Sequence, residues 1–148
     1  MNINNHLNFQ LNNIDIENRK LKLDSFILKN NSLIFEQNIM DLNKEEILLI
    51  IIQNVKTKEE FICKYLINKN SIIVLLDSLV HLFTNYEGEI RILSKNIDKY
   101  CSYTPILKDN TTIGTQKDII NQYTWFTRVL ENGQIRLSSI IKKQPINE

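Results

Sequence analysis

Residues 41–102 constrain the fold more than any other part of the chain, because their elements follow one distinctive order. Residues 43–46 and 57–60 each place a glutamate three positions after an Asn or Thr, which is typical of a capping box at a helix N-terminus. After a polar turn, apolar side chains recur at steps of four, three and four within 71–85, which predicts a third helix. A short strand and its return follow within 90–102. The pattern therefore predicts three helices followed by a hairpin.

Two stretches are compatible with either a helix or a strand. The all-apolar run 47–52 fits a buried strand as well as a helix, and the cap before it favours the helix. Residues 116–131 fit a helix with a glycine stop, but Asn132-Gly133 also fits a type I′ turn that joins strands 123–131 and 134–141. We favour a helix followed by a strand for this second stretch.

A small antiparallel sheet is expected before the helices. The apolar runs 26–28 and 33–35 flank Asn30-Asn31, and this arrangement is typical of two short strands joined by a turn. The texture of the sequence divides the chain into an N-terminal arm (1–19), a domain (20–102) and a C-terminal extension (103–148) that contains a helix, a hairpin or both. The extension suits dimerisation or docking.

Charge and composition exclude several classes of protein. The 148 residues carry 18 Lys and Arg against 17 Asp and Glu, so no global field attracts the chain to nucleic acid or to a membrane surface. The start lacks the pattern of a secretory signal, and the longest apolar run is far too short to span a bilayer. Cys63 and Cys101 do not make a disulfide framework, and Cys63 fits a small core residue. We expect a cytoplasmic protein with no membrane segment.

No pattern of residues points to catalysis. The sequence has no phosphate-binding glycine loop, no Cys-x-x-Cys and no His-Glu-x-x-His. His6 and His81 are too few for a zinc cluster or a histidine-based triad. The glutamate pairs at 45–46 and 59–60 are explained by helix capping. We therefore predict that the chain is not an enzyme and has no catalytic residue, cofactor or metal.

The order and spacing of these elements resemble the winged helix-turn-helix domain of the OmpR/PhoB type, in its stand-alone, ToxR-like form. The resemblance covers roughly residues 20–102. Its parts are the sheet-to-helix segment 30–49, the helix start 57–62, the apolar pattern of 71–83, and strand 90–92 with Tyr100. It implies an α+β fold with an N-terminal antiparallel sheet, three helices and a C-terminal hairpin, to which the C-terminal extension is added. The implied function is transcriptional regulation by a dimer that binds duplex DNA.

The resemblance also implies which residues contact DNA. In that family the third helix enters the major groove and the hairpin, or wing, touches the adjacent minor groove. The residues so implied are Lys69, Asn70, Ser71, Ser78, His81, Arg91, Lys95, Asn96 and Lys99.

The outer face of the expected third helix departs from the family pattern. The family places Arg and Lys there, because phosphates and guanine edges need donors. Here that face carries no fixed positive charge, and it suits a protein interface formed by Val74, Asp77, Ser78, His81 and Asn85. The alternative function is a protein-interaction module without DNA binding, such as an anti-activator or other partner of a regulator, or a toxin-neutralising immunity protein. A protein partner or self-association is expected.

Overall fold

The computed structural model describes residues 16–37, 46–76, 87–97, 99–108, 116–120 and 123–141. Every regular element in these ranges is a β-strand. The strands are β1 (Ile16–Leu23), β2 (Ser25–Lys29), β3 (Ser32–Glu36), β4 (Glu46–Asn54), β5 (Glu60–Asn68), β6 (Ser71–Leu75), β7 (Glu87–Asn96), β8 (Lys99–Leu107), β9 (Gln116–Ile120), β10 (Tyr123–Val129) and β11 (Ile135–Ile141).

The N-terminal hairpin follows from alternating burial and from its turn. In β2 and β3 the aromatic and leucine side chains at every second position are buried, as expected for strands with one face toward a core. Asn30 and Asn31 have φ of 52° and 62°, a left-handed conformation that asparagine tolerates and that a tight two-residue turn requires. The strands pair antiparallel from Ser25–Glu36 to Lys29–Ser32, which confirms the predicted hairpin.

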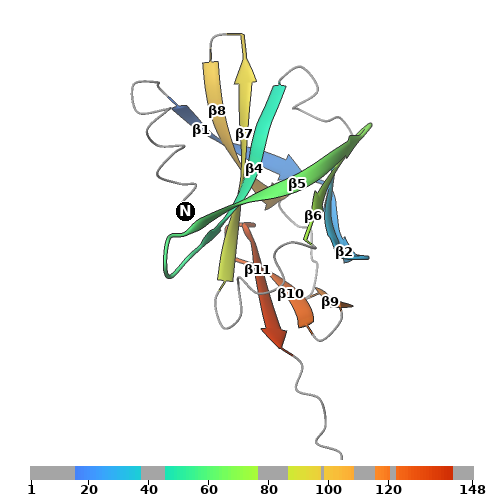
Figure 1. Cartoon of the computed structure of the whole chain (residues 1–148). Helices are drawn as coiled ribbons and strands as arrows, with labels where there is room; N and C mark the ends of the chain where they lie inside the picture. Colours follow the sequence, from blue (N-terminus) through green and yellow to red (C-terminus); the bar gives the residue numbers. More distant parts are fainter. Residues whose placement is uncertain are drawn as a thin grey trace, which may run out of the picture.

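The strands form one curled sheet with a branch. Neighbouring strands hydrogen-bond in the order β2-β3-β6-β5-β4-β7-β11-β10-β9, and β8 and then β1 branch from β7. The β1–β8 pair is parallel, whereas the pairs along the main order are antiparallel. The first and last strands of the order, β2 and β9, contact one another, so the sheet curls around its inner face (Figure 1).

Strand β5 passes from one part of the curled sheet to another. Its first residues, 60–63, pair with β4, whereas residues 64–68 pair with β6. Where β4 and β5 separate, the Tyr65 hydroxyl donates a hydrogen bond to the Ile47 carbonyl at 3.0 Å. This bond links β5 to β4 beyond the point where the backbone pairing of the two strands ends.

One hydrophobic core fills the inner face of the sheet. Its largest fully buried side chains are Trp125, Phe26, Phe35, Leu21, Leu23, Leu33, Ile50, Ile52, Ile72, Leu76 and Ile90. Cys63 and Cys101 are also buried, and both are free thiols. Burial raises the pKa of the Cys63 thiol to about 12, so this thiol stays protonated and unreactive at neutral pH.

The predicted winged helix-turn-helix and its α+β class are wrong, because the described residues that were expected in helices form strands. The run 47–52 lies in β4, where Ile50, Ile51 and Ile52 are all buried. The expected second helix corresponds to β5, and the start of the third to β6. Residues 77–85, the remainder of the expected third helix, lie outside the described residues. A run buried on both faces has no single apolar stripe, so its pattern cannot distinguish a strand from a buried helix.

Residues 57–59 of the expected capping box belong to the loop between β4 and β5, and Glu60 begins β5. The Asn54 carboxamide oxygen accepts hydrogen bonds from the backbone N–H groups of Lys56 at 2.9 Å and Thr57 at 3.1 Å. The Thr57 hydroxyl accepts from the Glu59 N–H at 3.3 Å. Short polar side chains bind nearby N–H groups in turns as readily as at helix ends, so the motif does not decide between them. Of the other box, only Glu46 is described, and it begins β4.

The C-terminal part is a hairpin, so the preferred helix over 116–131 is wrong and the alternative with two strands is confirmed. Strands β10 and β11 pair antiparallel from Tyr123–Ile141 to Val129–Ile135. The turn differs from the expected type I′, because Gly133 has φ of +90° while Asn132 has no positive φ. The Gly133 N–H donates to the Leu130 carbonyl at 2.9 Å, which closes a three-residue loop.

Strands on both sides of residue 103 share the same sheet. Strand β8 runs through residues 102 and 103, and it pairs with β1 and β7. Strand β11 pairs with the first residues of β7. The C-terminal hairpin therefore continues the sheet built by the earlier strands.

We expect Ile97→Asn to increase the free energy of unfolding by about 1 kcal/mol. Ile97 follows β7 with φ of 56°, a conformation that is costly for a β-branched side chain, and it is 84% exposed, so the substitution removes no core packing. Urea unfolding of the two proteins measures the difference. Ile97→Val is the matched control, because it keeps the branched Cβ. A gain of equal size in the valine variant would contradict the explanation by strain.

Candidate functional site

A row of aliphatic side chains crosses the outer face of four neighbouring strands. The strand register aligns Ile27 of β2 with Ile34 of β3, Ile34 with Ile73 of β6, and Ile73 with Leu66 of β5. Ile27 is 42% exposed and Leu66 is 56% exposed, although the residues beside Ile27 in sequence are buried in the core. These strands therefore carry aliphatic side chains on both faces, and those of the outer face include exposed ones.

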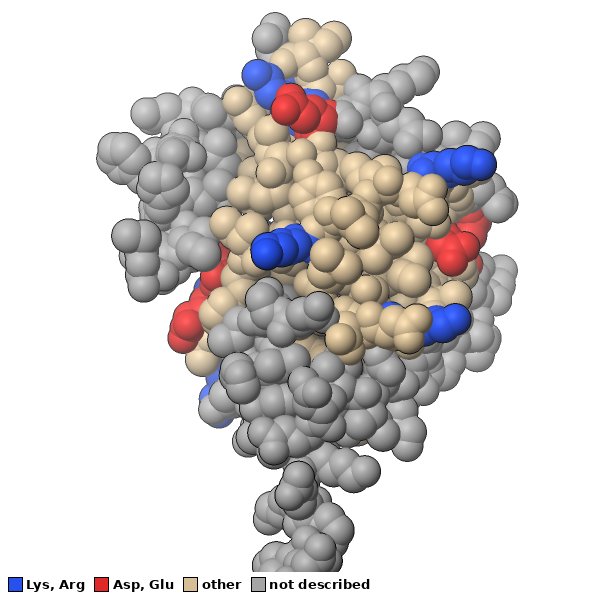
Figure 2. Space-filling view, turned by 45° about the vertical axis from the view of Figure 1, so that its right-hand side comes forward, with Lys and Arg blue, Asp and Glu red and all other residues tan. Residues whose placement is uncertain are grey.

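Further apolar side chains extend this row into a patch. Ile62 of β5, which is 43% exposed, and Leu75 of β6 lie on the same outer face by alternation along their strands. We call the six residues Ile27, Ile34, Ile62, Leu66, Ile73 and Leu75 the aliphatic face. Figure 2 brings forward the side on which β5, β6 and β2 lie in Figure 1, and shows a broad surface with few charged side chains. Contiguous exposed apolar surface of this kind marks interaction sites.

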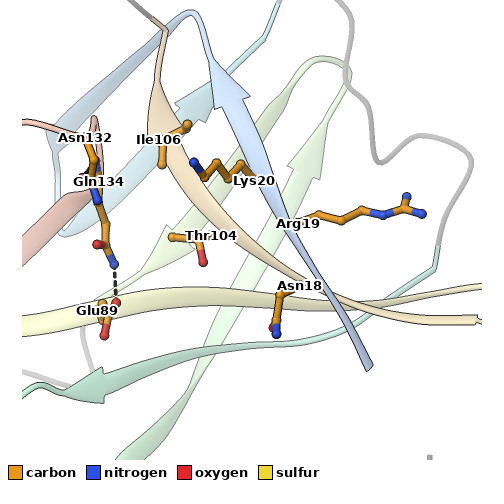
Figure 3. Close-up of a pocket in the computed structure, with 8 residues that line it drawn as sticks. All are labelled: Asn18, Arg19, Lys20, Glu89, Thr104, Ile106, Asn132 and Gln134. Atoms are coloured by element: carbon orange, nitrogen blue, oxygen red, sulfur yellow. Dashed lines mark hydrogen bonds between the residues drawn. The ribbon is translucent and has the colours of Figure 1, made fainter. Parts of the chain in front are cut away.

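A polar cleft opens where two strands separate on the same edge of β7. Residues 87–89 of β7 pair with β11 and residues 92–96 pair with β8, so β8 and β11 diverge between these two segments. The cleft has a volume of about 280 Å³. Its lining residues, drawn in Figure 3, are Asn18, Arg19, Lys20, Glu89, Thr104, Ile106, Asn132 and Gln134.

Three of the side chains that line the cleft, those of Gln134, Glu89 and Arg19, already have hydrogen-bond partners. The Gln134 carboxamide donates a hydrogen bond to the Glu89 carboxylate, as Figure 3 shows. The Arg19 side chain points away from the other lining residues in Figure 3, and its guanidinium pairs with Glu17 at 2.6 Å and donates to the Tyr103 hydroxyl at 3.3 Å. The hydrogen bond from Arg19 holds the pKa of Glu17 below its usual value.

The cleft offers hydrogen-bonding groups rather than a reactive pair. Amides, one hydroxyl, the Lys20 ammonium and the Glu89 carboxylate suit a small polar ligand. The lining contains no histidine or cysteine. Within the described part of the chain, no group of three or more His, Cys, Asp or Glu residues could hold a metal ion.

The residues that the resemblance assigned to DNA lie on two different hairpins. Lys69 and Asn70 form the turn between β5 and β6, and Ser71 begins β6. Lys95 and Asn96 end β7, and Lys99 begins β8. Arg91 lies within β7. Ser78 and His81 lie outside the described residues.

These positions do not form a surface that reads a DNA groove. The Lys95 ammonium lies 5.6 Å from the centre of the Tyr100 ring, and the Lys99 ammonium is 3.4 Å from the Glu17 carboxylate. No described residue is in a recognition helix, so the assignment of DNA binding and transcriptional regulation is wrong.

Of the residues expected to form the alternative interface, Val74 lies in the part of the chain that the structure describes. Val74 is fully buried in β6, because alternation turns it toward the core, so it is unsuited to a contact surface. Asp77, Ser78, His81 and Asn85 lie outside the described residues. The aliphatic face was not among the sequence predictions. The sequence does contain an indication of this face, because residues 26–28, 33–35 and 72–75 are apolar at consecutive rather than alternate positions.

The comparisons with known proteins show a likeness in fold and no family. No family model matches this chain, and no curated protein matches it. Among solved structures, S. aureus TarS is similar with a TM-score of 0.55 at 10% sequence identity. The alignment covers 84% of this chain and 25% of TarS, so the chain spans about a quarter of the length of that protein. At this identity the likeness concerns the fold alone.

This fold-level likeness assigns no activity to the chain, so the absence of enzymatic activity stays a prediction. In the described ranges, no helix is long and apolar enough to cross a membrane.

Proposed function

We propose that this chain is a protein-interaction module that binds a partner protein through the aliphatic face. The observation that carries the proposal is the unbroken row of Ile27, Ile34, Ile73 and Leu66, one residue from each of four adjacent strands. A stable monomer gains nothing from such a row on its outer face, whereas an interface gains from burying it.

The size of the aliphatic face predicts modest affinity. Four strands span about 19 Å and five residues along a strand span about 17 Å, so the aliphatic row together with its polar margins covers roughly 300 Å². The aliphatic side chains cover only part of this area, so their burial contributes less than about 8 kcal/mol before the costs of association are subtracted. Lost translational and rotational freedom opposes binding by about 4–15 kcal/mol. The face therefore supports binding only together with polar contacts at its margin.

The fold-level comparison supports a modular role. The similar region makes up a quarter of TarS, so this type of fold occurs as one part of a longer chain. Such a part contributes surface to an assembly when it contributes no chemistry of its own.

The proposal is tested by photo-crosslinking in cells that express the chain. The photoreactive residue benzoylphenylalanine replaces Ile34 or Leu66 on the aliphatic face, and Lys22, an exposed residue of β1, in the control protein. We expect covalent protein adducts from the two face positions and none from position 22. Adducts absent from both face positions, or equally abundant at all three, would contradict a binding role for the face.

A further inference from the structure

The charged residues at the margin of the aliphatic face indicate its partner. We infer that the partner is a second copy of this chain, packed face to face about a two-fold axis that runs along the aliphatic row. This inference rests on the proposed function, because it names the partner of the same surface.

The strand register places two further rows, one on each side of the aliphatic row, and every residue in them except Leu75 is polar. On one side lie Lys29, Ser32, Leu75 and Lys64, in the order β2, β3, β6, β5. On the other side lie Ser25, Glu36, Ser71 and Asn68, in the same order. The face is therefore basic along one margin and acidic along the other.

A two-fold axis along the aliphatic row brings opposite charges together. Rotation about this axis keeps each strand position but exchanges the two margins, so Glu36 of the second copy lies over Ser32. Lys29 is the cross-strand neighbour of Ser32, one strand spacing away. The symmetry repeats the contact, which gives two Lys29–Glu36 pairs between the copies. The aliphatic rows of both copies are then superposed, with their strands aligned as in a sandwich of two sheets.

The other face-to-face arrangement that keeps the strands of the two copies aligned is opposed by charge. If the two-fold axis runs parallel to the strands, β2 of one copy lies over β5 of the other. Each margin then lies over the same margin of the other copy. Lys29 of one copy then faces Lys64 of the other, twice over. Like charges that face each other across an interface destabilise the complex. The charged residues at the two margins therefore favour the arrangement with the two-fold axis along the aliphatic row.

The area limits the strength of the dimer. A face of this size is well below the roughly 800 Å² per partner of a standard stable interface. We therefore expect a reversible dimer with a dissociation constant in the micromolar range or weaker, seen as a mass that rises with concentration.

Analytical ultracentrifugation of the purified full chain from about 5 to about 500 µM, at about 150 mM salt, measures this association. The wild-type chain is expected to pass from monomer to dimer within that range. Ile34→Lys, at the centre of the row, is expected to remain monomeric throughout. Circular dichroism and thermal melting establish that the variant is folded.

Charge exchange tests the geometry separately from the apolar contact. Lys29→Glu and Glu36→Lys are each expected to weaken the dimer about threefold to tenfold, because each places like charges in both pairs. The double variant Lys29→Glu with Glu36→Lys is expected to recover the wild-type dissociation constant. Lys64→Glu is the matched control, since only the opposed arrangement would make it strengthen the dimer.

A chain that remains monomeric at every concentration would overturn the inference, and so would a dimer that the double variant fails to restore. The crosslinking experiment distinguishes this failure from failure of the proposed function. Adducts at twice the mass of the chain support a second copy. Adducts of another mass, together with a monomeric purified chain, would leave the proposed function standing and overturn self-association.

Discussion

Trp125→Ala is expected to lower the free energy of unfolding by about 3–5 kcal/mol, the usual cost of truncating a large aromatic side chain in a core. Trp125 is completely buried and is the largest side chain in the core. It lies in β10 between β9 and β11, so its loss opens a cavity where the C-terminal hairpin joins the sheet. Urea unfolding measured by circular dichroism gives the difference. Because most small domains are only about 5–15 kcal/mol stable, partial unfolding of the variant is expected.

Trp125→Phe distinguishes the loss of core packing from the cost of burying an indole N–H that has no hydrogen-bond partner. The indole Nε1 is buried with no hydrogen-bond partner in the described part of the chain, and so is the hydroxyl of Ser139, the residue paired with Trp125 across the strands. Phenylalanine removes the indole N–H, whose burial is itself costly, so the phenylalanine variant is expected to lose much less stability than the alanine variant. Equal losses in the two variants would contradict this account.

Gly133→Ala is expected to destabilise the protein by about 1–3 kcal/mol from backbone strain, with a further loss from a steric contact. Gly133 has φ of +90°, and a Cβ at this position would lie 2.8 Å from the Leu107 carbonyl oxygen. That oxygen belongs to the backbone at the end of β8, and the Gly133 carbonyl accepts the Leu107 N–H at 2.9 Å, so neither segment can retreat without losing the bond. Thermal unfolding measures the total effect.

Gly133→Asn identifies which of the two costs dominates. Asparagine tolerates positive φ better than alanine does but carries the same Cβ. If the contact with the Leu107 carbonyl dominates, asparagine and alanine destabilise the protein equally. A marked recovery with asparagine shows that the backbone conformation dominates. An alanine variant as stable as the wild type would contradict both reasons.

The aliphatic face shows why the candidate site could not be predicted from the sequence. Consecutive apolar residues such as 72–75 were assigned to a helix with Val74 on its outer face, whereas in strand β6 the same residues alternate between the core and the outer surface, and Val74 is buried. The row exists only because Ile27, Ile34, Ile73 and Leu66 come into register from separate strands. Registers between distant strands depend on the whole packed sheet, so no local pattern indicates them.

The polar cleft illustrates the same limit. Asn18 and Lys20 precede Glu89 by some 70 positions in sequence, and Asn132 and Gln134 follow it by more than 40. None of these residues belongs to a motif. They meet because β1 joins β8 in parallel and because β8 and β11 share one edge of β7.

The sequence by itself determined where the chain turns. Asn30-Asn31, the polar residues 68–70 and the glycine at 133 all mark real reversals, because short polar side chains and glycine suit tight turns whatever the flanking elements are. Only the tertiary structure decided what lies between the turns. The segments 47–52 and 61–67 are strands because neighbouring strands of the curled sheet supply hydrogen-bond partners for their backbones. Those partners lie elsewhere in the chain, and the local helical propensity of a segment does not depend on them.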